Sequence, residues 1–374
     1  MLYDPAAFEP LTNEPWDEAR ARDGIATVVA DADAAFDPDA LWPAHEWDGW
    51  NAALPMKNLY VGAAGVVWAL DELRRRGLAE TALDLPAIAI EAVERWRAEP
   101  DYVGGEALPE RPESGLLTGE VGILFVACKL GLPFEDDLRD RIRANLANEA
   151  EDLMWGTPGT LVAATAMGWD DLARESADAL ASRRDADGLW TQQLWGTSFR
   201  GIGTVHGLAG NVLSLLQVDD ARNEALRTES AEALSRAAKR VDGLANWGSE
   251  GKLQWCASGP GIVSLARDYL DEELLLAGAE LVWQAGAPGD EKGHGICHGT
   301  SGNGFALLAA FERTQDELWL DRARRFALHA LAQAQRRPGR YSLFTGGAGT
   351  ALFAAACLDG DARYPVLEGN RRAD

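Results

Sequence analysis

The chain is poor in several residue types. It has four cysteines and five histidines in 374 residues, and its five lysines stand against thirty arginines. Four cysteines are too few to hold a chain of this length together by disulfides, so reduced thiols are expected. No apolar run approaches the roughly 20 residues that a bilayer-spanning helix needs. The opening MLYDPAAFEPLTNEPW lacks the basic and apolar regions of a secretory signal, and a cytoplasmic location is expected.

Positive charge is also scarce. The 35 basic and 59 acidic residues give a formal net charge of −24. Nucleic acid and anionic membranes both need basic surfaces, so neither is expected as a partner. An acidic surface with so few lysines suggests a halophilic, salt-adapted host, and an ordinary acidic protein is the alternative.

Glycine, by contrast, is abundant, with 39 residues. A Gly-x-x-Gly element followed by an apolar run recurs seven times. The first positions of the seven copies are Gly62, Gly119, Gly156, Gly207, Ser258 (in a glycine's place), Gly299 and Gly346. Repeats of this length cannot bury their apolar faces alone and must stack on one another.

Two kinds of helix are predicted around these copies. Between them lie charged stretches with apolar residues three and four apart, which predict amphipathic outer helices over 85–99, 169–184, 221–241 and 317–337. The runs after each copy are apolar on nearly all sides and predict buried inner helices entered through the glycines. Convincing strand patterns are scarce. Seven outer–inner pairs that close on themselves give an all-α fold, an α/α toroid.

The domain prediction is one toroid over 1–374. Residues 1–55 form an N-terminal extension with outer helices in this prediction, and 366–374 form a tail. Closure brings the seven glycine loops to one end of the barrel, where the converging helix N-termini also favour anions.

Three of the loops carry residues typical of metal sites. QWCASGPG contains Cys256, GHGICHGTSG contains Cys297 and His298, and GTVHGLAG contains His206. Glycines around Cys297 and His298 allow the irregular backbone that two adjacent ligands need to converge on one point. A Cys₂His set with an open fourth position suits a catalytic zinc, and a fourth ligand such as His206 or His294 would make the zinc structural. A phosphate loop is excluded because no Gly-Lys-Ser/Thr is present and no strand precedes the glycines.

The order and spacing of WC, CHG and HGLAG within this glycine pattern resemble the lanthionine synthetase C family over nearly the whole chain. The resemblance implies an α/α toroid with seven inner and seven outer helices, and a zinc ion bound by Cys256, Cys297 and His298. It also implies that His206 is a catalytic histidine and that Asp152, in DLMWGTPG, is an acidic residue of the active site.

The segments KGHGICHG and YSLFTGGAG are more similar to the glutathione-binding LanC-like branch than to the lantibiotic cyclases. That similarity implies thiol-binding roles for Lys292 and for an arginine before the second segment, assigned to Arg340. His294 stands where the branch tends to have tyrosine and is expected to contact substrate or to hydrogen-bond a ligand residue. Lys252 stands where the cyclases have arginine, and Ala257 follows Cys256 where the branch has histidine. These departures leave the substrate's identity open.

The expected reaction is the addition of a thiol to dehydroalanine or dehydrobutyrine in a peptide or protein, giving a thioether. A zinc-bound thiol loses its proton, the thiolate adds to the β-carbon, and His206 supplies a proton to the α-carbon or accepts the thiol's proton. Asp152 would orient that histidine or hold the substrate amide, and a buried carboxylate that only hydrogen-bonds the helix entry is the alternative. In the family the thiol is a peptide cysteine or glutathione, and Lys292 would pair with an anionic thiol. The alternatives are a zinc- and thiol-binding regulator without turnover, or a toroid glycosidase or epimerase, which would not need the Cys–His set.

Overall fold

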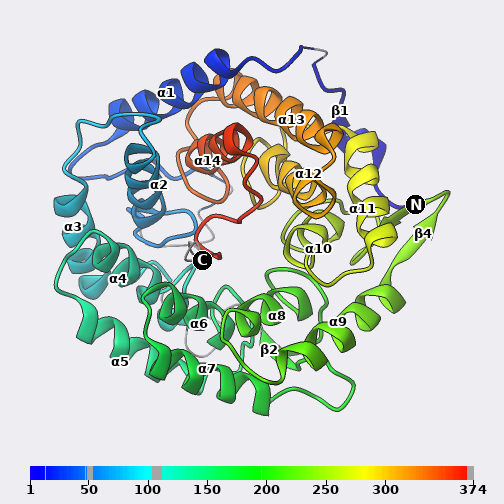
Figure 1. Ribbon diagram of the computed structural model, residues 1–374. Coiled ribbons are helices and arrows are strands. Elements are labelled where there is room, and N and C mark those ends of the chain that lie inside the picture. Colours follow the sequence, from blue (N-terminus) through cyan, green and yellow to red (C-terminus); the bar gives the residue numbers. More distant parts are fainter. Residues whose placement is uncertain (13, 47, 49–53, 103–111, 195, 369–374) are drawn as a thin grey trace.

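A computed structural model describes the protein except for residues 13, 47, 49–53, 103–111, 195 and 369–374. Within the described residues, fourteen α-helices form two concentric rings (Figure 1). The outer ring consists of α1 (Glu18–Ala35), α3 (Leu85–Ala98), α5 (Glu135–Asn145), α7 (Asp170–Ser182), α9 (Asn223–Ala237), α11 (Glu272–Ala285) and α13 (Glu317–Arg336). The inner ring consists of α2 (Ala63–Arg75), α4 (Glu120–Lys129), α6 (Thr157–Ala166), α8 (Leu208–Leu216), α10 (Gly259–Leu265), α12 (Thr300–Thr314) and α14 (Gly347–Asp359). The predicted α/α toroid is confirmed.

The two ends of the chain close the toroid, because α14 packs against both α1 and α2. Three of the four outer helices predicted from periodicity are present with nearly the predicted bounds. The exception is the stretch 221–241, in which α9 ends at Ala237 and the next residues form a strand. Asp242 and Gly243 both have positive φ, the geometry of a tight hairpin turn, so the chain reverses there instead of continuing the helix.

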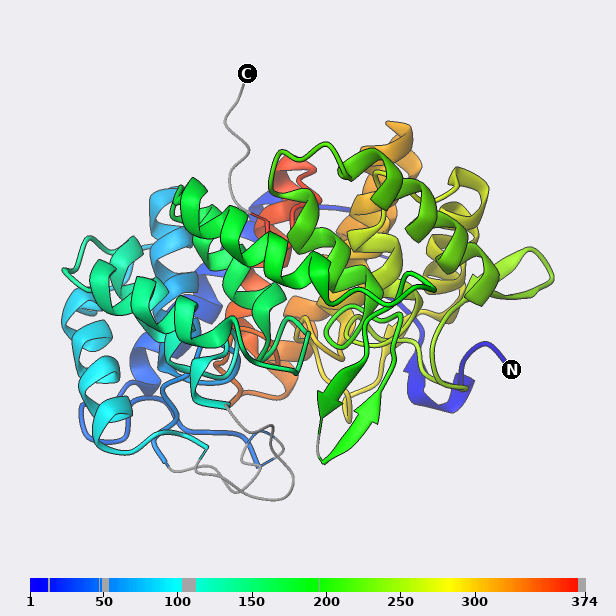
Figure 2. The same cartoon turned by 90° about the horizontal axis from the view of Figure 1, so that it is seen from below.

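The strands of the described residues form three short antiparallel pairs. They are β1 (Phe8–Glu9) with β6 (Ala287–Pro288), β2 (Gln192–Leu194) with β3 (Thr197–Phe199), and β4 (Lys239–Val241) with β5 (Leu244–Asn246). The β2–β3 hairpin projects from the end of the barrel at which the inner helices begin (Figure 2). No helix in the described part of the chain is long and apolar enough to cross a membrane.

Each inner helix begins at a Gly-x-x-Gly element, as predicted. The first residue of every copy is the helix N-cap, including Ser258 in the fifth copy. The second residue lies in the first helical turn against a carbonyl oxygen of its own loop. A Cβ at Gly302 would lie 1.9 Å from the oxygen of Ile296, and one at Gly261 would lie 1.9 Å from that of Trp255. No side chain fits there, which explains why the second glycine recurs.

A closed ring of backbone hydrogen bonds joins the seven loops. Every loop donates one N–H to the next loop's carbonyl, and the seventh donates to the first. The N···O distances are 2.7 Å for Tyr60 to Leu117, 3.2 Å for Leu117 to Met154, 3.0 Å for Leu153 to Val205, 3.1 Å for Val205 to Cys256, 3.3 Å for Cys256 to Cys297, 2.7 Å for Cys297 to Phe344 and 3.1 Å for Phe344 to Tyr60. Nearly all of these residues stand two positions before the first glycine of their copy, so the ring fixes equivalent positions of the repeat beside one another.

The chain after α14 returns to the middle of the inner ring (Figure 1). The predicted tail, 366–374, is therefore not a tail in its described part: Val366 and Leu367 are buried, as is Tyr364 before them. These apolar side chains pack inside the inner ring (Figure 1). Residues 369–374 of the predicted tail lie outside the described residues.

Candidate functional site

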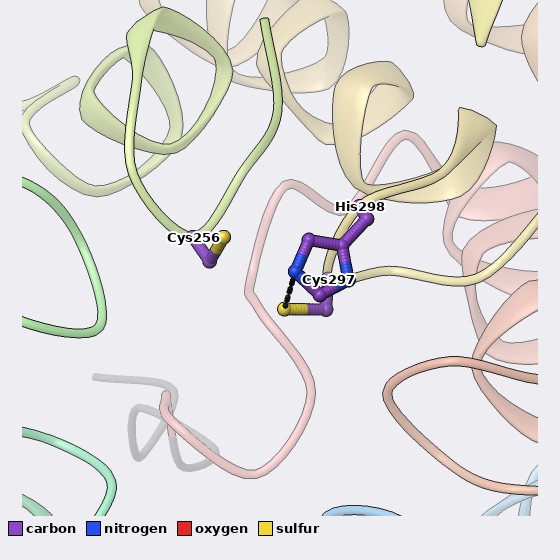
Figure 3. Close-up of side chains that lie close together, drawn as sticks. All are labelled: Cys256, Cys297 and His298. Atoms are coloured by element: carbon purple, nitrogen blue, oxygen red, sulfur yellow. Dashed lines mark hydrogen bonds between the residues drawn. The ribbon is translucent and has the colours of Figure 1, made fainter. Parts of the chain in front are cut away.

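Cys256 and Cys297 occupy the same position of the ring in adjacent loops, joined by the bond from the Cys256 N–H to the Cys297 carbonyl. Their side chains point to a common space together with that of His298 (Figure 3). The ligand atoms of the three residues lie within 4.8 Å of one another, and Cys297 Sγ is 3.6 Å from His298 Nε2. The predicted convergence of these residues is therefore present, and all four cysteines of the chain are free thiols.

The two thiols differ in their electrostatic environment. Hydrogen bonds from the Cys297 thiol, from His298 and from Gln254 Nε2 hold the pKa of Cys256 well below its ordinary value. Burial, and the hydrogen bond to Cys256, raise the pKa of Cys297, although the Tyr60 hydroxyl bonds its sulfur. The pair therefore gives up its first proton readily, and the two sulfurs together hold one negative charge.

The donor set fits zinc. Tetrahedral zinc with bonds of about 2.3 Å to sulfur and about 2.0–2.1 Å to nitrogen requires ligand atoms roughly 3.5 Å apart. The 3.6 Å between Cys297 Sγ and His298 Nε2 meets this requirement without rearrangement. Two thiolates and one imidazole leave a fourth position for another ligand.

His206, in the loop next to that of Cys256, forms a dyad with Asp152 of the preceding loop. Its Nδ1 lies 2.7 Å from Asp152 Oδ2, and 23 % of its side chain is exposed. Asp152 is fully buried, and its Oδ1 accepts the N–H groups of Met154, Trp155 and Gly156 at 3.0, 2.7 and 3.2 Å. The carboxylate is therefore fixed by its own loop, and it fixes the imidazole. The ring of Trp155 stacks on the His206 imidazole, with the two ring centroids 5.6 Å apart.

The loop of His206 lies directly against the loop of Cys256. The N–H of Val205 bonds the carbonyl of Cys256, and a Cβ at Gly203 would come within 3.2 Å of the backbone of Ala257. His206 and His298 both stand one position before the first glycine of their copies, so the repeat directs both imidazoles to the same end of the barrel.

The three cationic residues that were predicted to contact the thiol differ in their exposure. Lys252 and Lys292 are exposed in the loops that carry Cys256 and Cys297. Arg340 is half-buried and its guanidinium lies over the backbone of Gly293, where an added Cβ would be 2.7 Å from Nη1. Burial lowers the pKa of this guanidinium.

His294 lies behind the site. It is 2 % exposed, its Nδ1 bonds the hydroxyl of Thr350 at 2.9 Å, and burial lowers its pKa to about 4. Its ring is therefore neutral and directed to α14. This burial argues against contact with substrate, and Nδ1 bonds Thr350 instead of a cysteine or His298.

Two residues near the cluster were missed by sequence reasoning. Tyr60, whose hydroxyl bonds Cys297, occupies in the first copy the ring position of the two cysteines. Asp48 is buried, accepts a 2.8 Å hydrogen bond from the hydroxyl of Thr345 and interacts electrostatically with His298. Thr345 holds in the seventh copy the place that His298 holds in the sixth. Aligning the seven copies would have selected Tyr60 and Thr345, whereas no motif marks Asp48.

The opposite end of the barrel holds a cavity of about 640 Å³. It is lined by the C-terminal parts of inner helices and by residues 361–368, with several arginines among them. Most of these arginines are paired, as Arg76 is with Asp359 and Arg363 with Asp361. The Cys256–Cys297–His298 cluster and the His206–Asp152 dyad lie at the other end.

Comparisons with known proteins agree with this arrangement. The family model described as lanthionine synthetase C-like protein matches residues 54–368. A Danio rerio protein named glutathione S-transferase LANCL1 is 35 % identical over 130 residues, which span 31 % of this chain and 31 % of that protein. The solved structure of nisin cyclase is similar in fold, with a TM-score of 0.57 and 16 % identity, over 86 % of this chain and 94 % of that one.

Proposed function

The chain belongs to the lanthionine synthetase C-like family, and from this premise we propose that it is an enzyme that adds a thiol to a dehydroamino acid. The observation that carries the proposal is the convergence of Cys256, Cys297 and His298 beside the His206–Asp152 dyad. A Lewis-acidic site and a proton-transfer group at the same end of the barrel are what this addition requires.

The three ligand residues would hold a zinc ion. Zinc in such a set supplies acidity: it lowers the pKa of a thiol bound at its open position, so that thiolate is present at neutral pH. The protein contributes the arrangement of the donors. The backbone ring fixes Cys256 relative to Cys297, and the turn between the glycines brings His298 to the same point.

His206 would carry the proton. Attack of the thiolate on the β-carbon forms the C–S bond and moves the π electrons of the alkene onto the α-carbon and its carbonyl. In the proposal, His206 takes the thiol's proton and returns it to the α-carbon, so that the product is a neutral thioether. Asp152 keeps the imidazole oriented and stabilises its protonated form, because its Oδ2 bonds Nδ1 at 2.7 Å.

The thiol is proposed to be anionic. Lys292, Lys252 and Arg340 bring three cations to the loop end of a chain with a net charge of −24, which supports recognition of a carboxylate-bearing thiol. The name of the Danio rerio relative supports glutathione, and a cysteine of the substrate peptide is the second candidate. A cytoplasmic location, where thiols stay reduced, belongs to the same proposal.

The test uses the full chain loaded with zinc. It is incubated with a dehydroalanine peptide and glutathione, and separately with a peptide that carries both cysteine and dehydroalanine, and products are followed by mass spectrometry. We expect adduct or ring formation above the rate without protein, and only the background rate after zinc is removed by a chelator. Stoichiometric zinc with background rates for both substrates would overturn the enzymatic proposal in favour of a binding protein. Absence of zinc would favour a different chemistry on this fold.

A further inference from the structure

The C-terminal segment, residues 361–368, reaches the two cysteine loops from inside the barrel. The fully buried ring of Tyr364 stacks on Trp255, with centroids 4.3 Å apart and planes inclined by 10°. Its hydroxyl donates a 2.8 Å hydrogen bond to the carbonyl of Ile296. Trp255 directly precedes Cys256, and Ile296 directly precedes Cys297, so one side chain contacts both ligand-bearing loops next to their cysteines.

The carbonyl of the residue before Cys256, and that of the residue before Cys297, each accept a side-chain hydrogen bond. This bond distinguishes the two cysteine loops from the others. The Ile296 carbonyl is bonded by Tyr364, and the Trp255 carbonyl is bonded by the hydroxyl of Thr204 at 2.8 Å. In the other five copies the equivalent carbonyls belong to Leu59, Leu116, Leu153, Thr204 and Leu343. Within the described part of the chain, no side chain bonds any of those five, so this brace is confined to the loops that carry the thiols.

The segment that presents Tyr364 is itself anchored. The carboxylate of Glu368 accepts the N–H of Tyr364 at 2.8 Å and pairs with the buried Arg267, which follows α10, at 2.6 Å. Gln217, which follows α8, donates to the carbonyl of Leu367 at 2.8 Å. Residues of the inner ring therefore hold the segment that carries Tyr364. The segment separates the cysteine loops from the 640 Å³ cavity.

We propose that Tyr364 is a positioning residue for the metal centre. Its hydroxyl and its ring hold the backbones of Cys256 and Cys297 at the separation that a shared ion requires. The inference rests on the proposed zinc function, and it assigns to the C-terminal segment the role of a floor beneath the ligands. Outer partners of metal ligands typically change metal affinity by about 10–100-fold when they are removed.

The test compares Tyr364→Phe, which removes only the hydroxyl, with the matched control Tyr269→Phe. Tyr269 lines the cavity at the opposite end, and its hydroxyl has no hydrogen-bond partner among the residues that the structure describes. Zinc affinity is measured by chelator competition, and the thiolate charge-transfer band is measured after replacement by Co²⁺. We expect Tyr364→Phe to weaken zinc binding by about tenfold and to shift the Co²⁺ band, and Tyr269→Phe to change neither.

A merely structural role would lower the melting temperature of metal-free Tyr364→Phe and leave zinc affinity and the Co²⁺ spectrum as in the unmodified protein. That result would overturn the inference. If Tyr364→Phe does not accumulate, Glu368→Gln replaces it, since it loosens the anchor and keeps the tyrosine, with the same expectations.

A separate readout distinguishes this inference from the proposed function. If the unmodified protein binds no zinc, the zinc proposal fails, and the alkylation rate of Cys297 in the metal-free protein then decides the positioning role. Cys297 is 2 % exposed, so we expect slow alkylation that Tyr364→Phe accelerates severalfold. Equal rates in the two proteins would then contradict a positioning role.

Discussion

Two parts of the loop ring share one backbone arrangement and differ in their side chains. In the first, second and seventh copies the ring residues are Tyr60, Leu117 and Phe344, and the rings of Tyr60 and Phe344 stack with centroids 5.0 Å apart. In the fifth and sixth copies the ring residues are Cys256 and Cys297. The same type of backbone hydrogen bond holds both parts. The first part packs apolar and aromatic side chains inside the barrel, and the second brings two thiols together.

The chemistry of this fold depends on the side chains that the ring positions carry. The ring defines seven equivalent positions, and the residue types at those positions decide whether a loop is structural or reactive. The next position also varies in residue type between copies, with Thr118 in the second, His206 in the fourth and His298 in the sixth.

The largest effect is expected from removing one sulfur ligand. Cys297→Ala should abolish stoichiometric zinc and reduce thiol addition to the background rate, because two remaining donors bind zinc weakly. Cys357→Ala, in α14, is the matched control, since that thiol is equally buried and lies outside the cluster. Zinc per chain is measured by elemental analysis. A Cys297→Ala protein that keeps one zinc would contradict the assignment of the metal ligands to the fifth and sixth copies.

Replacing the dyad histidine should separate catalysis from metal binding. His206→Asn is expected to lower the addition rate by about 10²–10⁴-fold, the usual contribution of a proton-transfer residue, with zinc content unchanged. Thr118→Val alters the equivalent position of the second copy and should leave the rate within a few-fold of the unmodified protein. Comparable losses in both variants would mean that the position matters and the imidazole does not.

In the structural part, filling the space at a second glycine should affect stability alone. A Cβ at Gly122 would lie 2.0 Å from the carbonyl oxygen of Leu116, so Gly122→Ala should lower the free energy of unfolding by about 1–3 kcal/mol. Zinc content should stay at one per chain. Gly289→Ala, where the nearest atom is 3.5 Å from the added carbon, is the control. Denaturant titration measures both, and equal stabilities would contradict the steric explanation.

His294 should affect stability only at acid pH, although it lies in a reactive loop. Burial lowers its pKa in the folded protein to about 4, below the ordinary value of 6.5. As pH falls below 6.5 the unfolded chain takes up the proton first, so stability present above this pH is lost between pH 6.5 and 4. The slope reaches about 1.4 kcal/mol per pH unit. Urea unfolding of metal-free protein at several pH values measures it, and His294→Gln should flatten the profile.

The smallest effect is expected from salt, and it should be alike in both parts. A net charge of −24 repels itself in the compact state, and rising KCl screens this repulsion. Refolding yield and melting temperature should therefore rise with KCl, as the hypothesis of a salt-adapted host requires. A stability maximum at low salt would contradict that hypothesis.

Much of the fold could be predicted because each signal is local. Glycines at a fixed offset mark the inner-helix entries, and three- and four-residue spacing marks the outer helices. Cys256, Cys297 and His298 could be grouped because they hold nearly the same place in adjacent copies. Closure of the repeat was then enough to bring them together.

The remaining features depend on information that side-chain patterns do not carry. The hydrogen-bonded ring uses backbone groups, which every residue has. Asp48 and Tyr364 reach the site from segments outside the repeat, so no copy of the motif points to them. The hairpin after α9 depends on two residues with positive φ, Asp242 and Gly243, following a stretch whose composition still favours helix.

The ring also sets an order of events during synthesis of the chain. The N–H of Cys297 bonds the carbonyl of Phe344, and the N–H of Phe344 bonds the carbonyl of Tyr60, so the sixth loop is complete only after the seventh has joined the first. A nascent chain in which both cysteines have left the ribosome still lacks the residues that hold their loops in place. The proposed metal centre therefore depends on nearly the whole chain, and we expect metal loading to follow translation.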